Sequence, residues 1–255
     1  MHQALQTLLF IGPMAFLAGL IDSIAGGGGL ISLPAYLAAG LPPHLAAGTN
    51  KCTAMFGTSV AAFRYVRQKK VHWPSALAAV LGAFPGATLG ARLNLLVNPD
   101  AMRIVMMVLL PVVGIALALR PNFGEKEFWQ SRSFGRLAAI SLAVGFTVGV
   151  YDGFFGPGTG TFLLLAFTAL CGFDLVTANG NTKIVNLTTN LASVVTFALA
   201  GSIWYAVALP AALCNMAGGY VGSGLALTRG ARVIRPVYYI VLALLMCKVV
   251  LDFFA

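Results

Sequence analysis

Charged residues are scarce in this chain, and acidic residues are the scarcest. Only 7 of the 255 residues are Asp or Glu, 16 are Lys or Arg, and charged residues make up 9% of the total. Soluble proteins carry about a quarter of their residues as charged groups. Here 59% of the residues are hydrophobic and the mean hydropathy is +0.88. This composition excludes an ordinary soluble domain and predicts an all-α polytopic membrane protein whose surface mostly faces lipid.

Residue types that build metal sites and enzyme active sites are also scarce. The four cysteines lie in apolar surroundings without CxxC spacing, and the three histidines are scattered along the chain. Such cysteines are typical of small packing residues rather than of metal ligands. The sequence contains no nucleotide-binding loop, nucleophile elbow or HExxH motif. We therefore predict no enzyme activity, no cofactor and no metal site.

The excess of basic residues does not indicate a nucleic-acid partner. The net charge is +9, but most of the basic residues lie in short connectors between apolar runs. In that position, positive charge marks the cytoplasmic side of a membrane protein. The partner that the sequence predicts is the lipid bilayer.

Eight apolar segments are long enough to span a membrane, which requires about 17 to 25 residues. They are residues 4–22, 44–66, 74–96, 101–119, 135–152, 178–200, 206–226 and 235–253. Two shorter apolar pieces, 30–41 and 159–171, each follow a glycine run. A dozen helical residues rise only about 18 Å, which is too little to cross the hydrocarbon core. We predict that these pieces are half-helices joined to the preceding span by unwound backbone, giving about 8–10 membrane segments.

The chain contains the same module twice. Phe16, Gly19 and Asp22 recur 130 positions later, and Lys51, Gly86 and Gly90 recur 132 positions later. The later copies are Phe146, Gly149, Asp152, Lys183, Gly218 and Gly222. We therefore predict an N-terminal repeat at 1–119, a connector at 120–134 and a C-terminal repeat at 135–255. Paired repeats of this kind are typical of secondary transporters, whose substrate binds between them.

Loop charges predict that the two repeats have inverted topology. The loop at 67–70 is strongly basic, whereas its counterpart at 201–205 has no charge. The next pair is reversed, because 98–100 is weakly charged and 229–235 contains three arginines. Matching loops then lie on opposite sides of the membrane, with the basic loops and the connector in the cytoplasm. Inversion needs an odd number of crossings per repeat, and either five crossings or three crossings plus a half-length hairpin satisfies it.

The glycine runs have two interpretations, close helix packing and a substrate site. They contain Gly26, Gly27, Gly28 and Gly29 in the first repeat and Gly156, Gly158 and Gly160 in the second. Several glycines in succession destabilise a helix, and irregular backbone in a membrane must be buried or face a cavity. The N–H groups that open the following half-helix would then attract an anion. We favour the substrate site.

A lysine occupies the same internal position in each repeat. Lys51 follows Thr49 and Asn50, and Lys183 follows Asn181 and Thr182, with Asn186 one turn later. A single lysine near a helix end is expected to extend to the membrane interface. Two at matching positions, each beside groups that form hydrogen bonds, indicate ligand contacts instead. We assign all seven residues to a candidate anion site.

An aspartate ends the first span of each repeat. Asp22 and Asp152 lie directly before the glycine runs. Three interpretations stay open at this stage: a helix boundary or N-cap, a salt-bridge partner for Lys51 or Lys183, and a proton carrier in a coupled transport cycle.

These motifs together resemble the sulfite exporter TauE/SafE family of bacterial membrane permeases. The resemblance rests on residues 19–29, Pro34, residues 46–51 and the repeat of the last segment at 178–183. It covers nearly the whole chain except the connector. It implies a multi-pass protein of the bacterial inner membrane that moves sulfite or other small organosulfur anions without ATP. The family is usually described as two halves of about four helices, which differs from the odd count that the loop charges predict.

The residues and the resemblance agree on a small anionic substrate. We predict a secondary transporter that works by alternating access, with proton coupling as one open mechanism. The alternative is an anion channel in which the paired sites form a continuous pore. A non-transporting membrane scaffold also fits the composition, but it does not explain the polar pairs. The sequence leaves the direction of transport, the cargo and the oligomeric state open.

Overall fold

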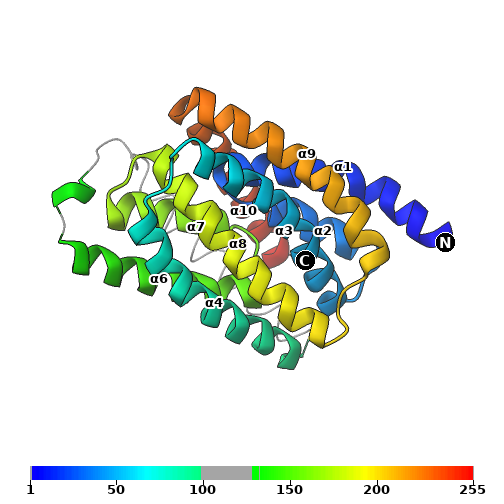
Figure 1. The fold of residues 1–255 in the computed structure, drawn as a ribbon. Coiled ribbons are helices and arrows are strands. Elements are labelled where there is room, and N and C mark those ends of the chain that lie inside the picture. The colour runs from blue at the N-terminus through cyan, green and yellow to red at the C-terminus, as the bar shows by residue number, and fades with distance from the viewer. Residues whose placement is uncertain (1, 99–127, 132, 255) are drawn as a thin grey trace.

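The computed structural model describes residues 2–98, 128–131 and 133–254, and these residues form helices and short connections without any strand (Figure 1). The N-terminal half contains α1 (His2–Ala25), α2 (Gly29–Ala38), α3 (Pro43–Arg67) and α4 (Trp73–Leu96). The C-terminal half contains η1 (Trp129–Ser131), α6 (Phe134–Phe154), α7 (Thr159–Ala166), η2 (Phe167–Cys171), α8 (Leu175–Leu199), α9 (Tyr205–Arg229) and α10 (Ala231–Phe254). The predicted segment 101–119 and most of the connector lie outside the described residues.

The other seven predicted spanning segments each coincide with a long helix, and the two short pieces coincide with α2 and with α7 plus η2. By length and hydropathy alone, three stretches of the described residues could cross a membrane: Thr7–Ala25, Trp73–Leu96 and Phe134–Phe154. Helices α3 and α8 have 25 residues each, about 37 Å, which is also long enough. Their mean hydropathy is lowered by polar residues that are buried against other helices.

The polarity of the surface and the interior fits a protein surrounded by lipid. Large apolar side chains are widely exposed on the outside, among them Leu9, Leu81, Leu199 and Leu213, each at least two-thirds exposed. The interior holds many buried Asn, Thr and Ser side chains, together with two lysines and an aspartate. In water this distribution would be unfavourable, whereas in a bilayer the exposed apolar residues contact lipid tails.

The two halves interlock instead of forming separate bundles. Helix α9 runs along α1, and α6 runs along α4, with α3 and α8 between these two pairs (Figure 1). Glycines allow the close approach: a Cβ on Gly86 would lie 2.5 Å from the Phe146 carbonyl oxygen, and one on Gly222 would meet the Leu20 carbonyl oxygen. Small residues allow this kind of backbone contact between helices in lipid.

Specific contacts recur with the two halves exchanged. The backbone N–H of Trp204 donates to Thr49 Oγ1 at 3.0 Å. In the repeat, His72 matches Trp204 and Asn181 matches Thr49, each at an offset of 132 positions. The N–H of His72 likewise donates to Asn181 Oδ1 at 2.9 Å. The contacts of Gly86 with Phe146 and of Gly218 with Phe16 are also related by the repeat, with offsets of 132 positions for the glycines and 130 for the phenylalanines. The repeat seen in the sequence therefore has a counterpart in how the helices pack.

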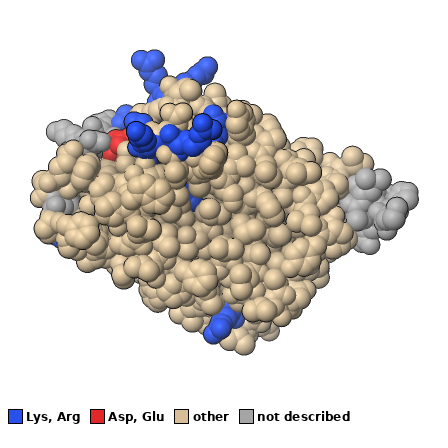
Figure 2. All heavy atoms as spheres, in the orientation of Figure 1, with Lys and Arg blue, Asp and Glu red and all other residues tan. Residues whose placement is uncertain are grey.

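Basic side chains gather at one end of the molecule (Figure 2). The loop after α3 contains Lys69 and Lys70, which are exposed, and it lies against the start of α8, because a Cβ on Gly180 would meet the Lys70 carbonyl oxygen. The connector reaches the same loop through Trp129, whose ring lies 4.8 Å from that of His72. Burial lowers the pKa of the His72 imidazole, which favours its neutral form. The uncharged loop after α8 lies instead at the start of α3, beside Thr49.

Candidate functional site

The glycine runs interrupt the helices as predicted. Residues 26–28 separate α1 from α2, and residues 155–158 separate α6 from α7. Gly26 and Gly27 have φ values of 79° and 89°, and Gly156 and Gly158 have φ values of 92° and 82°. These are left-handed conformations that glycine adopts without steric cost and other residues rarely adopt. The unwound backbone follows directly from the residue type.

The two glycine runs pack directly on each other. A Cβ on Gly160 would lie 2.6 Å from Gly26 Cα, so neither position has room for a side chain. The Thr161 hydroxyl donates to the Ala25 carbonyl at 3.3 Å, which ties the start of α7 to the end of α1. The half-helices of the two repeats therefore begin at one shared point.

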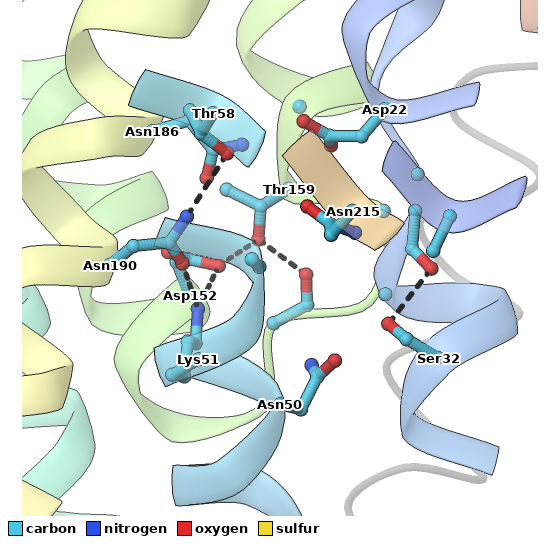
Figure 3. Close-up of a pocket in the computed structure, with 18 residues that line it drawn as sticks. Asp22, Ser32, Asn50, Lys51, Thr58, Asp152, Thr159, Asn186, Asn190 and Asn215 are labelled. Carbon is cyan, nitrogen blue, oxygen red and sulfur yellow. Dashed lines mark hydrogen bonds and ion pairs between the residues drawn. The ribbon is translucent and has the colours of Figure 1, made fainter. Parts of the chain in front are cut away.

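A small cavity of about 30 Å³ lies beside this point, between the two halves (Figure 3). Its walls combine backbone from both glycine runs with polar side chains from seven helices. The polar side chains are Asp22, Ser32, Asn50, Lys51, Thr58, Asp152, Thr159, Asn186, Asn190 and Asn215, and the glycines are Gly27, Gly28, Gly29, Gly156, Gly158 and Gly160. A cavity of this size holds about two water molecules.

A buried ion pair forms one wall of the cavity. Lys51 Nζ lies 2.6 Å from Asp152 Oδ1, and the two side chains are 6% and 2% exposed. The same ammonium donates to Asn190 Oδ1 at 3.3 Å, and the Thr159 hydroxyl donates to Asp152 Oδ1 at 2.6 Å (Figure 3). Gly156 leaves room for the lysine, because a Cβ there would lie 3.1 Å from Nζ.

Two polar atoms at this site have no hydrogen-bond partner among the residues that the structure describes. Asp152 Oδ2 and Asn50 Oδ1 are both fully buried and unpaired. Leaving such atoms unpaired costs about 1–3 kcal/mol each, and more for a charged oxygen. They are acceptors that a bound water, proton or ligand donor would satisfy.

The second lysine forms an ion pair at the matching sequence positions, in different surroundings. Lys183 Nζ lies 3.1 Å from Asp22 Oδ2, and the lysine side chain is 0% exposed while the aspartate side chain is 18% exposed. The ammonium also donates to the Asp22 backbone carbonyl near the end of α1. Lys183 is not among the residues that line the cavity, although Asp22 is.

Each aspartate therefore pairs with the lysine of the other half. This is the salt-bridge interpretation among the three that the sequence left open for Asp22 and Asp152. Neither aspartate lies in the cap position of the helix that follows it, since those positions are Gly28 and Gly158.

Five predicted site residues do not line the cavity. Thr49 and Asn181 accept hydrogen bonds from the backbone of the loops before α9 and α4. Thr182 is fully buried, and its hydroxyl has no hydrogen-bond partner in the described structure. Gly26 is also outside the lining, because it contacts Gly160 instead. Lys183 lies outside the lining as well, and the other nine predicted residues all line the cavity.

Several lining residues were absent from the predicted site. Thr58 and Asn190 occupy matching positions 132 residues apart, and Asn190 Nδ2 lies 3.5 Å from the Thr58 hydroxyl. Asn190 follows Asn186 by one helical turn, and this spacing could have indicated it. Asn215 on α9 and Ser32 on α2 follow no repeated pattern in the sequence, so only the packing of the helices reveals them.

Comparison with known proteins identifies the family of this chain. The sequence model of the family described as "Sulfite exporter TauE/SafE" matches residues 11–249. The chain belongs to the TauE/SafE family. The resemblance noted in the sequence is thus confirmed over nearly the whole chain.

Relatives of this TauE/SafE protein are named as membrane transporters. It is 37% identical to "Probable membrane transporter protein ORF9" of Sinorhizobium sp, over 98% of this chain and 94% of the relative. It is 38% identical to "Probable membrane transporter protein YfcA" of Escherichia coli K12, over 97% and 90% of the two chains. A "Probable membrane transporter protein" of Haemophilus influenzae is 34% identical, over 99% and 98%. No solved structure shows significant similarity.

These findings identify a multi-pass membrane transporter of the bacterial inner membrane. In this TauE/SafE protein the cavity lies at the contact of the two halves.

Proposed function

We propose that the protein is a secondary transporter of a small sulfur oxyanion, either sulfite or an organosulfonate, and that it works by alternating access between two inverted halves. The family description and the transporter names of the relatives support the general class. The observation that carries the choice of an anion is the buried Lys51 ammonium, which faces a polar cavity at the junction of the two glycine runs.

The groups around the cavity suit an oxyanion. Sulfite and sulfonates present three oxygens that accept hydrogen bonds. Lys51 supplies a cation, and the side-chain amides of Asn50, Asn186 and Asn190 supply N–H donors from two facing helices. Charge-assisted hydrogen bonds of this kind are stronger than neutral ones, particularly in a dry site.

The small size of the cavity supports alternating access over the channel alternative. Space for about two waters is too little for an anion with four heavy atoms. Substrate entry therefore requires the halves to separate, and the direct contact of Gly26 with Gly160 is the place where they would part. A channel would need a continuous wet path through the same point.

The charge balance of the site supports proton coupling through Asp152. The pair of Lys51 and Asp152 is neutral as a unit, so an incoming anion meets the carboxylate as well as the ammonium. A proton on Asp152 removes that repulsion and frees Lys51 to bind the anion. Asp22 also lines the cavity, but its partner Lys183 does not. A proton on Asp22 would therefore free no ammonium that faces the cavity.

A thermal-shift screen tests the anion site. The purified protein is melted in detergent with sulfite, thiosulfate, sulfoacetate, taurine and carboxylate analogues, because a specific ligand raises the melting temperature by mass action. We expect sulfite or a sulfonate to stabilise the protein more than the carboxylate of the same size. Equal shifts with chloride at the same ionic strength would argue against a built oxyanion site.

Proteoliposome flux tests the proton step. We expect an inward proton gradient to accelerate uptake by the wild type and to have no effect on Asp152→Asn, which keeps shape but cannot be charged. The matched control is the double variant Asp22→Asn/Lys183→Met, which removes the other pair as a neutral unit and should keep the gradient effect. Loss of the effect in both variants, or its survival in Asp152→Asn, would exclude Asp152 as the proton carrier.

A further inference from the structure

A groove with both charged and apolar lining residues lies on the outer surface of the protein, on α3 and α9 at the basic end. It is a groove of about 710 Å³ lined by Ser59, Val60, Phe63, Arg64, Arg67, Gln68 and Tyr220. Phe63 and Tyr220 are 61% and 60% exposed. The groove is separate from the cavity between the halves and shares no lining residue with it.

Two arginines are held in this groove by aromatic rings. The Arg64 guanidinium lies 4.1 Å from the centre of the Tyr220 ring and donates to the Tyr220 carbonyl. Gly224 makes room for it, since a Cβ there would lie 3.0 Å from both terminal nitrogens. The Arg67 guanidinium lies 5.7 Å from the centre of the Phe63 ring. Cation–π contacts of this kind fix the position of a guanidinium without neutralising it.

Neither arginine has an acidic partner in the described part of the chain. The acidic side chains described there are three. Asp22 and Asp152 bind the buried lysines, and Asp174 accepts from the backbone at the start of α8. The two guanidinium groups thus line one groove, and no carboxylate among the described residues neutralises them. An anion bound in the groove would supply that charge.

The two ends of the groove differ in polarity along α3. Arg67 and Gln68 lie at the helix end, Phe63 and Arg64 come one turn earlier, and Val60 lies about 10 Å from Arg67 toward the middle of the helix. The groove is therefore cationic at the membrane interface and apolar toward the membrane interior. A phospholipid has the same order of groups, a phosphate at the interface and an acyl chain below it.

The matching surface of the other half lacks this character. The residues 132 positions after those of α3 are Leu191, Ala192, Val195, Thr196, Leu199 and Ala200. Leu191, Val195 and Leu199 are 45%, 47% and 86% exposed, so that surface is apolar to its end. The arginine groove is thus a feature of one half, and it lies at the end that we assign to the cytoplasm.

We propose that this groove binds an anionic phospholipid, with the headgroup phosphate between Arg64 and Arg67 and one acyl chain along Val60, Phe63 and Tyr220. Basic pockets on transmembrane helices at the cytoplasmic side are suited to such headgroups, and arginine pairs match the geometry of phosphate oxygens. The site is independent of the transported anion.

Native mass spectrometry of the full-length protein tests this proposal. The protein is released from nanodiscs that contain equal amounts of phosphatidylglycerol and phosphatidylcholine with identical acyl chains. We expect the wild type to retain phosphatidylglycerol at least fivefold over phosphatidylcholine, and Arg64→Gln/Arg67→Gln to lose that preference. The matched control, Lys69→Gln/Lys70→Gln, removes two charges from the adjoining loop and should keep it.

A second measurement does not depend on removing the arginines. Trp introduced as Phe63→Trp should be quenched more strongly by brominated phosphatidylglycerol than by brominated phosphatidylcholine. Equal retention of the two lipids by the wild type, or equal loss of preference in both double variants, would overturn the proposal, because it would reduce the effect to overall charge. Displacement of the lipid by millimolar inorganic phosphate would show a site for soluble phosphate and would also overturn it.

Discussion

Lys51 and Lys183 occupy the same position in the two repeats but lie in different surroundings. Lys51 contacts Asp152 and Asn190 at the wall of the cavity, with Thr159 beside them. Lys183 is enclosed and contacts both the carboxylate and the backbone carbonyl of Asp22. The difference arises because Asn190 corresponds to Thr58 and Thr159 corresponds to Gly29, so the second pair has fewer polar neighbours.

Substitution of the lysines should separate these two roles. Lys51→Met leaves the buried Asp152 without its ammonium partner, and Lys183→Met does the same to Asp22, which is 18% exposed. Each should lower the free energy of unfolding, by about 3–5 kcal/mol for Lys51→Met and by less for Lys183→Met, because water reaches Asp22. Only Lys51→Met should also lower the affinity for the anion, by at least tenfold, about 1.4 kcal/mol. Thermal melting and ligand titration of the purified variants measure the two effects.

Neutralising the partner aspartate provides the control. Lys183→Met/Asp22→Asn should recover stability and bind the anion normally, whereas Lys51→Met/Asp152→Asn should recover stability alone. If both double variants bind the anion as the wild type does, the lysines serve only to hold the halves together, and the anion site would have to rest on backbone N–H groups and amides.

At the scale of helices, close backbone contact is the main feature of the pairs α4–α6 and α1–α9. Glycines on α4 and α9 face backbone carbonyls of α6 and α1 at matching positions in the two pairs. Without a hydrophobic driving force between helices in lipid, such packing supplies much of the attraction. A single added methyl group at one of these positions pushes two backbones apart.

Gly86→Ala should therefore destabilise the protein although alanine is the better helix former. The added Cβ would lie 2.5 Å from the Phe146 carbonyl oxygen, so the helices must separate. We expect the melting temperature in detergent to fall by several degrees. The matched control is Gly135→Ala on α6, where a Cβ meets nothing within 4 Å and the helix propensity of alanine should leave the stability unchanged or slightly higher. Equal melting temperatures for the two variants would contradict the packing argument.

In the whole molecule, contacts that one half makes with the other recur with the roles of the two halves exchanged, and this supports inverted topology. Inverted topology and the repeat boundaries at 1–119 and 135–255 stay predictions. The basic loop after α3 and the uncharged loop after α8 lie at opposite ends of α3. Since these loops occupy matching positions in the repeats, an axis in the membrane plane would relate them.

Cysteine labelling in intact cells tests this arrangement. A cysteine introduced at Gln68 should be protected from an impermeant maleimide reagent until the cells are opened, because positive loops face the cytoplasm. A cysteine at Ser202 should react from the outside. Replacement of the four native cysteines removes background labelling. Reaction of both positions from the same side would mean parallel repeats.

The sequence predicted the fold class and the elements of the site, because these depend on local composition. Spanning length and hydropathy predicted seven of the described helices, and glycine runs predicted the breaks before α2 and α7. The spacing of the two modules predicted that Lys51 and Lys183 would occupy equivalent positions. Family membership follows from the same motifs.

Only the tertiary structure decided how these parts meet. It paired each lysine with the aspartate of the other half, turned Thr49 and Asn181 toward loops, and brought Asn215 from α9 to the cavity. The sequence could not specify these contacts, because they join residues more than 100 positions apart and depend on how all the helices pack together. A helix forms from its own residues, whereas the surroundings of a buried charge are set by every helix around it.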